Sequence, residues 1–190
     1  MKRSFYILSL SFILAGIVHI LIILLIPSYA AKDAWTKLEQ VTNPWKFTIV
    51  AEPGEESRIL ELVDPAFGTA ACRYDLENAP LRVTAKGHLP FWSVAIFDRQ
   101  GRNIYSFNDR TAIEQELALL VVNPVQMAQI RKAPPPGSEK AVLVESSVKQ
   151  GFVLIRALQE NATWGPEVKR FLTNAKCEQY VDYAVAEPDS

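Results

Sequence analysis

The sequence is poor in the residues from which metal and cofactor sites are built. Its 190 residues include two cysteines, two histidines and two methionines, and no CxxC or HxxxH spacing occurs. A zinc site takes its ligands from Cys, His and acidic side chains at short spacings, so the sequence predicts no metal site. It also lacks a nucleophile motif and a cofactor-binding motif. We therefore expect no cofactor and assign no catalytic residue.

Runs of one charge are missing as well. The chain carries 20 basic and 21 acidic residues, a formal net charge of −1, and the basic residues form no run or stripe. Domains that bind nucleic acid gather lysine and arginine on one face, where these side chains meet the phosphates. Nucleic acid is therefore not an expected partner.

One long stretch of the chain has no formal charge. It begins at Phe5 and ends at Ile26, which makes 22 residues, and Pro27 follows it. As a helix this stretch is about 33 Å long, enough to cross a hydrocarbon core of roughly 30 Å. We predict a transmembrane helix over residues 5–27, by which the protein contacts the membrane.

The flanking charges predict the orientation of this helix. Lys2 and Arg3 are the only charged residues before it. The positive-inside rule keeps residues 1–4 in the cytoplasm and places residues 33–190 on the other side of the membrane. The whole domain is then exported.

Two features of the segment leave alternatives open. Ser28, Tyr29 and Ala30 have the small-x-small pattern of a signal-peptide cleavage site. The apolar region of a signal peptide usually has about 7–15 residues, so the greater length here favours an uncleaved anchor. His19 lies within the span, where an ionisable residue can be functional or a neutral, hydrogen-bonded imidazole. No acidic residue accompanies it there, which favours the neutral form.

Both cysteines, Cys72 and Cys177, belong to the exported part. An even number of cysteines in an oxidising compartment predicts one disulfide. It would close a loop of about 100 residues, for which the chain-entropy model gives up to about 4.7 kcal/mol of stabilisation. The alternative is two separate buried thiols.

The exported part has the length of one domain, and its pattern is mostly that of short strands. Apolar and polar residues alternate without a fault from Leu81 to Lys86, while residues 91–97 are nearly all apolar and predict a strand buried on both faces. Further strands are expected at residues 46–50, 66–74, 103–107, 117–122, 141–148 and 152–158. Short helices are expected at residues 33–38, 124–131 and 165–175.

The turns between these strands predict the fold class. The strand at residues 91–97 should form a hairpin with residues 103–107, and residues 141–148 should form another with residues 152–158. Many strands joined by tight turns, with few helices, are typical of an antiparallel sandwich or open barrel with short helices. One transmembrane helix would precede this mostly β domain.

Aromatic and polar side chains concentrate in the first of these hairpins and just after it. Five of them form a candidate site that would bind a sugar or peptide through aromatic faces and polar groups: Trp92, Tyr105, Asn108, Asp109 and Arg110. The alternative is that Trp92, Phe97 and Phe107 belong to the core. In that case residues 108–110 form only a turn.

Three blocks of the sequence carry a resemblance to a known family. They are Cys72-Arg73-Tyr74-Asp75-Leu76 followed by Pro80, then Phe91-Trp92-Ser93, and the stretch from Asn103 to Arg110. On these blocks the chain resembles the family called domain of unknown function 1254, in its short membrane-anchored form from alphaproteobacteria. The resemblance implies a β domain on the periplasmic face of the bacterial inner membrane. In longer relatives a second β domain is fused to it, so a separate envelope protein with a complementary β domain is the implied partner.

Two functions from different classes fit these observations. In the first, the domain is a non-enzymatic envelope module that binds a second envelope protein or a cell-wall glycan. In the second, it is a hydrolase or transferase that acts on envelope glycans through two carboxylates, chosen from Asp75, Asp98 and Asp109. Aspartate is common at turns for backbone reasons alone, so we favour the module.

Overall fold

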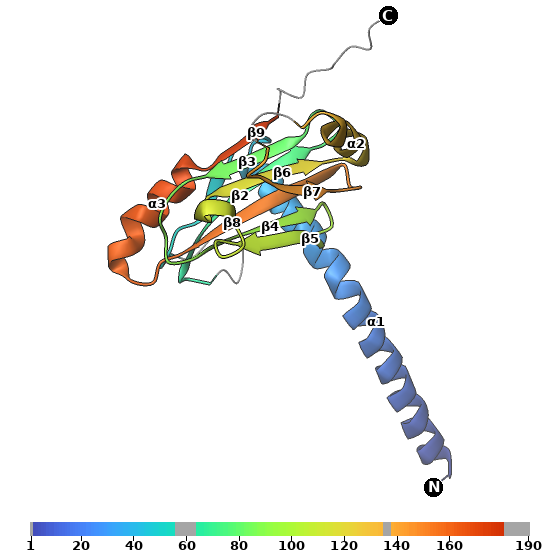
Figure 1. The fold of residues 1–190 in the computed structure, drawn as a ribbon. Coiled ribbons are helices and arrows are strands. Elements are labelled where there is room, and N and C mark those ends of the chain that lie inside the picture. Colours follow the sequence, from blue (N-terminus) through green and yellow to red (C-terminus); the bar gives the residue numbers. More distant parts are fainter. Residues whose placement is uncertain (1, 56–63, 135–137, 181–190) are drawn as a thin grey trace, which may run out of the picture.

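The computed structural model describes residues 2–55, 64–134 and 138–180, and one long helix projects from its β domain (Figure 1). This helix, α1 (Lys2–Val41), has 40 residues and is about 60 Å long. Its apolar part, Arg3–Ile26, has no residue buried in the structure. By length and composition, this part suits a membrane anchor or a signal sequence.

The helix is longer than the sequence predicted. We expected the span to end at Pro27 and a separate short helix to follow at residues 33–38, but α1 continues through Pro27 without a break. A proline removes one backbone hydrogen bond from a helix. Beyond it, Trp35 and Leu38 are buried against the β domain. This packing stabilises the second half of α1 and offsets the lost bond.

The β domain is a sandwich of two sheets, which confirms the predicted fold class. The five-stranded sheet has the order β1 (Thr48–Ala51), β2 (Phe67–Asp75), β8 (Gln150–Leu158), β4 (Trp92–Asp98) and β5 (Asn103–Asn108). The four-stranded sheet has the order β7 (Val142–Glu145), β6 (Leu117–Val122), β3 (Leu81–Ala85) and β9 (Lys176–Gln179). Every strand pair is antiparallel except β6 with β7.

Strand pairing confirms one predicted hairpin and contradicts the other. β4 and β5 pair as a hairpin. The strands expected at residues 141–148 and 152–158 do not pair with each other: β7 joins the four-stranded sheet, and β8 lies between β2 and β4 in the other. The turn residues between them carry the chain across the sandwich. Strand β9 was not predicted, because four residues with alternating charge give little apolar signal.

Two short helices cover the sandwich. α2 (Pro124–Lys132), which was expected, begins with a cap in which the Asn123 side chain accepts a hydrogen bond from the Gln126 backbone N–H. α3 (Gly165–Asn174), also expected, buries Val168, Phe171 and Leu172. Short 3₁₀ turns, η1 (Ile113–Gln115) and η2 (Ala162–Trp164), complete the fold.

The predicted disulfide is confirmed and crosses the core between the two sheets. It joins Cys72 on β2 to Cys177 on β9, across 105 residues of sequence. Both cysteines are buried, with relative exposures of 0 % and 5 %. The bond therefore fixes the last strand of one sheet to a central strand of the other. The last ten residues of the expected domain, 181–190, lie outside the described residues.

Candidate functional site

The predicted site lies on the β4–β5 hairpin, but its tryptophan, Trp92, belongs to the core. Trp92 is 1 % exposed. Its ring stacks on Phe171 of α3 and meets the ring of Phe107 edge to face. Trp92 therefore does not line a cleft, and the prediction that it stacks on a ligand is corrected. The site prediction overlooked that β4 alternates, with its even-numbered side chains facing inward.

The same alternation corrects the prediction that this strand is buried on both faces. Ser93, Ala95 and Phe97 on the outer face are only partly buried. The reason is that this face of the sheet points away from the second sheet; the central strand β8 likewise exposes Arg156 on it. The edge strand β5 is more open still, and its Tyr105 is 43 % exposed. Tyr105 contacts Phe107, so it forms the exposed end of a row of rings that leads into the core.

The three polar candidates lie together in the turn that follows β5. The Asn108 side chain accepts a hydrogen bond from the Arg110 backbone N–H, and the Asn108 backbone carbonyl accepts one from the Thr111 hydroxyl. The Arg110 side chain is exposed. Asp109 is 9 % exposed, and its buried Oδ1 has no hydrogen-bond partner among the described residues. Asn108, Asp109 and Arg110 therefore lie at the open end of the hairpin, whereas Tyr105, which is opposite Ile96, lies nearer the tip.

The chain leaves this turn through a strained connection that sequence analysis did not identify. Glu114 and Gln115 are consecutive non-glycine residues with positive φ, 56° and 57°. Left-handed backbone costs roughly 1–2 kcal/mol per residue for L-amino acids. Two contacts hold this conformation: the Trp92 indole N–H donates to the Gln115 carbonyl at 3.3 Å, and Lys140 pairs with the Glu114 carboxylate at 2.6 Å.

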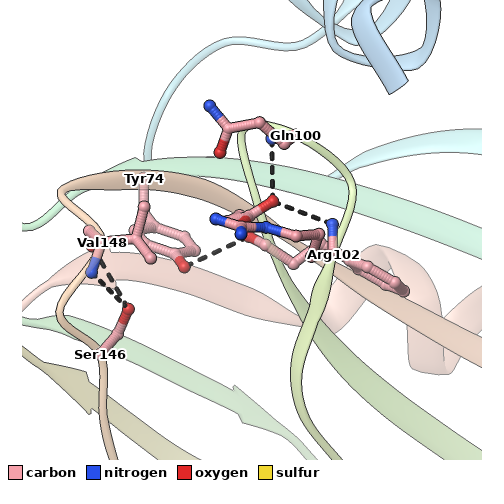
Figure 2. Close-up of polar contacts among 7 residues, drawn as sticks. Tyr74, Gln100, Arg102, Ser146 and Val148 are labelled. Atoms are coloured by element: carbon pink, nitrogen blue, oxygen red, sulfur yellow. Dashed lines mark hydrogen bonds and ion pairs between the residues drawn. The ribbon is translucent and has the colours of Figure 1, made fainter. Parts of the chain in front are cut away.

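The tip of the same hairpin is ordered around a buried carboxylate (Figure 2). Asp98 is 2 % exposed and accepts hydrogen bonds from the backbone N–H groups of Gln100 and Arg102 at 2.8 and 2.9 Å. The Arg102 guanidinium adds an ion pair at 2.6 Å. These donors satisfy the carboxylate, so Asp98 closes the turn between β4 and β5.

Tyr74 extends this polar cluster into the sandwich (Figure 2). Its hydroxyl donates to the Phe97 carbonyl at 3.4 Å. Burial, and then the nearby Asp98 carboxylate, raise the pKa of Tyr74 well above its ordinary value of 10.0. The Tyr74 ring also lies against Gly151, where an added Cβ would be 2.2 Å from the Phe97 carbonyl oxygen and 2.5 Å from the Tyr74 hydroxyl. Only glycine fits at position 151.

The three candidate catalytic aspartates do not come together. Asp109 bonds to the first residue of β4 and Asp98 is the last, six residues and about 20 Å away. Asp75 ends β2 on the outer face, since Tyr74 before it faces the core, whereas Asp98 faces inward. Asp75 accepts hydrogen bonds from the Gln150 side chain and the Glu77 backbone N–H. A glycosidase needs two carboxylates about 5–10 Å apart across one cleft, and this geometry is not present here.

The structure also reveals a junction between α1 and the sheet. Arg73 on β2 donates to the Thr42 hydroxyl, to the Thr42 carbonyl and to the Glu39 carboxylate, at 3.0, 2.8 and 3.2 Å. The guanidiniums of Arg73 and Arg99 lie 5.8 and 5.3 Å from the ring centre of Trp35. These contacts fasten the end of α1 to the outer face of the five-stranded sheet. The sequence signal for this junction was Arg73, the single arginine in a strand of mostly small or apolar residues.

An open groove lies away from the predicted site, between β1 and the start of α3. Its volume is about 380 Å³. Ile49, Pro53, Val168 and Leu172 give it an apolar lining, and the pair formed by Glu52 and Lys169 lies at its border. None of the predicted site residues lines this groove. Among the residues that the structure describes, no three His, Cys, Asp or Glu side chains gather as a metal site.

The fold is similar to parts of two larger solved structures. The VPA0106 protein from Vibrio parahaemolyticus matches with a TM-score of 0.59 at 12 % identity, over 85 % of this chain and 40 % of that one. An uncharacterised protein from Burkholderia cenocepacia matches with a TM-score of 0.51 at 14 % identity, over 85 % of this chain and 42 % of that one. No protein-family model and no curated protein matches the sequence. The chain thus shares its fold with less than half of two longer proteins.

Proposed function

We propose that this protein is a single-pass protein of the bacterial inner membrane whose periplasmic β domain is a non-enzymatic binding or assembly module. The apolar span of α1 is long enough to be the anchor, and Lys2 and Arg3 favour a cytoplasmic N-terminus. The disulfide between Cys72 and Cys177 fits an oxidising compartment such as the periplasm. Membership of the domain of unknown function 1254 family, which the sequence resembles, is part of this proposal.

The edge strand β5 is the observation that carries the proposal. Its six residues, Asn103–Asn108, contain no charge and no proline, and no described strand pairs with its outer side. The other edge strands, β1, β7 and β9, have four residues each. Soluble proteins usually protect a sheet edge with charges, proline or a short strand. An unprotected edge is suited to strand addition, in which a partner strand extends the sheet.

The partner we propose is a second envelope protein that contributes an extended strand from a complementary β domain. The solved structures with this fold are more than twice as long as their matched part, which leaves room in them for further domains. The turn that follows β5 lies at the end of this edge and exposes the Arg110 side chain, which is available to the same partner.

Backbone hydrogen bonding identifies the position that tests this proposal. The Asp109 N–H donates to the Trp92 carbonyl, so residues 105, 107 and 109 bond to β4, while the N–H groups of residues 106 and 108 face away. The Asn108 N–H donates to the Thr111 hydroxyl, which leaves that of Ser106 for a partner strand. Ser106→Pro removes one outward donor and leaves the ladder with β4 intact. Ser106→Thr at the same position keeps the donor and is the matched control.

The experiment is photo-crosslinking in native membranes, with the photoreactive amino acid at position 105. We expect a crosslinked product of defined mass with the parent chain and with Ser106→Thr, and its loss with Ser106→Pro. Recovery of monomer only, or the same product with Ser106→Pro, would contradict strand addition at this edge.

The alternative of a hydrolase or transferase on envelope glycans gains no support from the positions of Asp75, Asp98 and Asp109. Two of them are engaged in turn hydrogen bonds, and no pair shares a face and a cleft. We therefore do not propose it as a second function.

A further inference from the structure

The continuity of α1 fixes the height of the β domain above the membrane. The apolar span ends at Ile26, and Trp35 is buried against the β domain. Trp35 follows Ile26 by nine helical steps, which corresponds to about 14 Å along the axis. Arg73, Thr42 and Leu38 hold the end of the helix on the sheet, so α1 is not a loose tether.

The tip of the β4–β5 hairpin lies beside the helix at the same level. Arg99 lies 5.3 Å from the Trp35 ring centre, and Figure 1 shows the β4–β5 hairpin beside α1 where the helix leaves the sandwich. The headgroup region extends roughly 5–8 Å beyond the hydrocarbon core. The guanidinium of Arg99 therefore lies within about one Debye length, roughly 8 Å, of the headgroups.

The charges at this tip favour an anionic surface. Arg99, Gln100 and Arg102 are exposed, and the acidic residue at the base of the turn, Asp98, is buried and paired with Arg102. Nearby acidic groups are paired in the same way, Glu39 with Arg73 and Glu77 with Lys149. Arg99 itself forms no ion pair among the described residues, so its charge is not compensated by them. Guanidinium groups bind phosphate oxygens well because their donors match them in geometry.

We propose that the hairpin tip, residues 99–102, binds the headgroups of anionic phospholipids, with Arg99 as the main contact. This inference rests on the proposed membrane anchor. The contact would hold the β domain at one tilt over the bilayer, and would thereby present the β5 edge at a constant height to a partner in the same membrane.

The test uses the full chain in nanodiscs of phosphatidylcholine, with and without about one third phosphatidylglycerol. Hydrogen exchange of residues 99–103 is followed by mass spectrometry at low and at high salt. We expect exchange to be several-fold slower with the anionic lipid at low salt, and this difference to disappear at high salt because surface charges are then screened.

Three variants separate lipid binding from a structural role of Arg99. Arg99→Gln should abolish the lipid dependence, whereas Arg99→Lys, which loses the guanidinium contact with the Trp35 ring but keeps the charge, should retain much of it. Arg131→Gln, which removes an exposed arginine on α2, should behave like the parent chain. Equal exchange in both lipids, or an unchanged effect in Arg99→Gln, would overturn this inference alone. Failure of the chain to insert would overturn the proposed anchor as well.

Discussion

The two ends of the β4–β5 hairpin are built on the same pair of strands but differ in how completely their polar groups are satisfied. At the tip, the Asp98 carboxylate accepts two backbone hydrogen bonds and an ion pair, and Tyr74 and Gly151 pack beside it. At the open end, the buried Asp109 Oδ1 has no partner among the described residues, and the chain continues through two left-handed residues.

This difference separates an end whose polar groups stabilise the fold from an end that leaves a buried polar group unsatisfied. Buried polar groups are normally hydrogen-bonded, and strained backbone persists where the surroundings impose it, often at functional sites. At the tip, the buried carboxylate is hydrogen-bonded and no residue other than glycine has a positive φ. At the open end, a buried oxygen has no partner among the described residues and two non-glycine residues have a positive φ. Substitutions at the two ends should therefore have opposite effects on stability.

The largest effect is expected from Gly151→Ala beside the tip. A Cβ at this position would lie 2.2 Å from the backbone oxygen of Phe97, which cannot move without breaking the sheet. We expect a loss of about 3–5 kcal/mol in the free energy of unfolding, measured by denaturant titration. Gly165→Ala is the control, because its Cβ would meet only the flexible Gln159 side chain at 3.2 Å. Equal losses in both variants would show that the tip is not tightly packed.

The direct comparison of the two ends is between Asp98→Asn and Asp109→Asn. Asp98→Asn weakens an ion pair and two charge-assisted hydrogen bonds, so we expect a loss of about 2–3 kcal/mol. Asp109→Asn removes a buried charge from an oxygen without a partner, and should be neutral or slightly stabilising. Both values come from denaturant titration at pH 7. A larger loss with Asp109→Asn would reverse our assignment of the two ends.

A smaller, pH-dependent effect is expected from Tyr74→Phe. The folded state holds the pKa of Tyr74 above its ordinary value of 10.0, so at high pH the unfolded state releases a proton that the folded state retains. The free energy of unfolding of the parent chain should therefore fall as the pH rises above about 10. Below that pH, ionisation of Tyr74 should make no contribution to its pH dependence.

In Tyr74→Phe this alkaline decrease should be weaker, with a loss of about 1 kcal/mol at neutral pH from the missing hydrogen bond. Unfolding midpoints between pH 8 and 11 measure both effects. If the two chains lose stability in parallel above pH 10, Tyr74 is not the group responsible.

The smallest effect is expected at the strained connection of the open end. Glu114→Gly allows a positive φ without the cost of a Cβ, and should stabilise the fold by about 0.5–1 kcal/mol, less the lost pair with Lys140. Glu114→Gln is the control for that pair, since it removes the charge but keeps the strain. Thermal unfolding of the three chains gives the difference. A destabilised Glu114→Gly would mean that φ at this position carries no strain.

Local sequence signals predicted most of the elements, because they depend on neighbouring residues. The alternation at Leu81–Ala85 and the cap and proline at Asn123 and Pro124 determine a strand and a helix start in this way. The single pair of cysteines likewise allowed one disulfide. In the candidate site, the sequence located the hairpin and the turn at Asn108–Arg110.

What the sequence did not reveal depends on contacts between distant residues. The stretch at residues 149–151 has the composition of a hairpin turn, but Gly151 is required there by Tyr74, which lies on another strand. Trp92 was mistaken for a ligand contact because its burial comes from Phe171, far along the chain. The continuation of α1 past Pro27 likewise depends on Trp35 and Leu38 meeting the sheet.

The bond between Cys72 and Cys177 has a consequence for the order in which the domain matures. One thiol belongs to β2 and the other to β9, so oxidation has to wait until nearly the whole β domain has been synthesised. Once the sheets close, neither sulfur is open to attack by a small thiol, because exchange requires direct access. A reductant added to the mature protein should then reduce the disulfide only at the rate at which the domain unfolds. The bond therefore persists for as long as the two sheets stay packed.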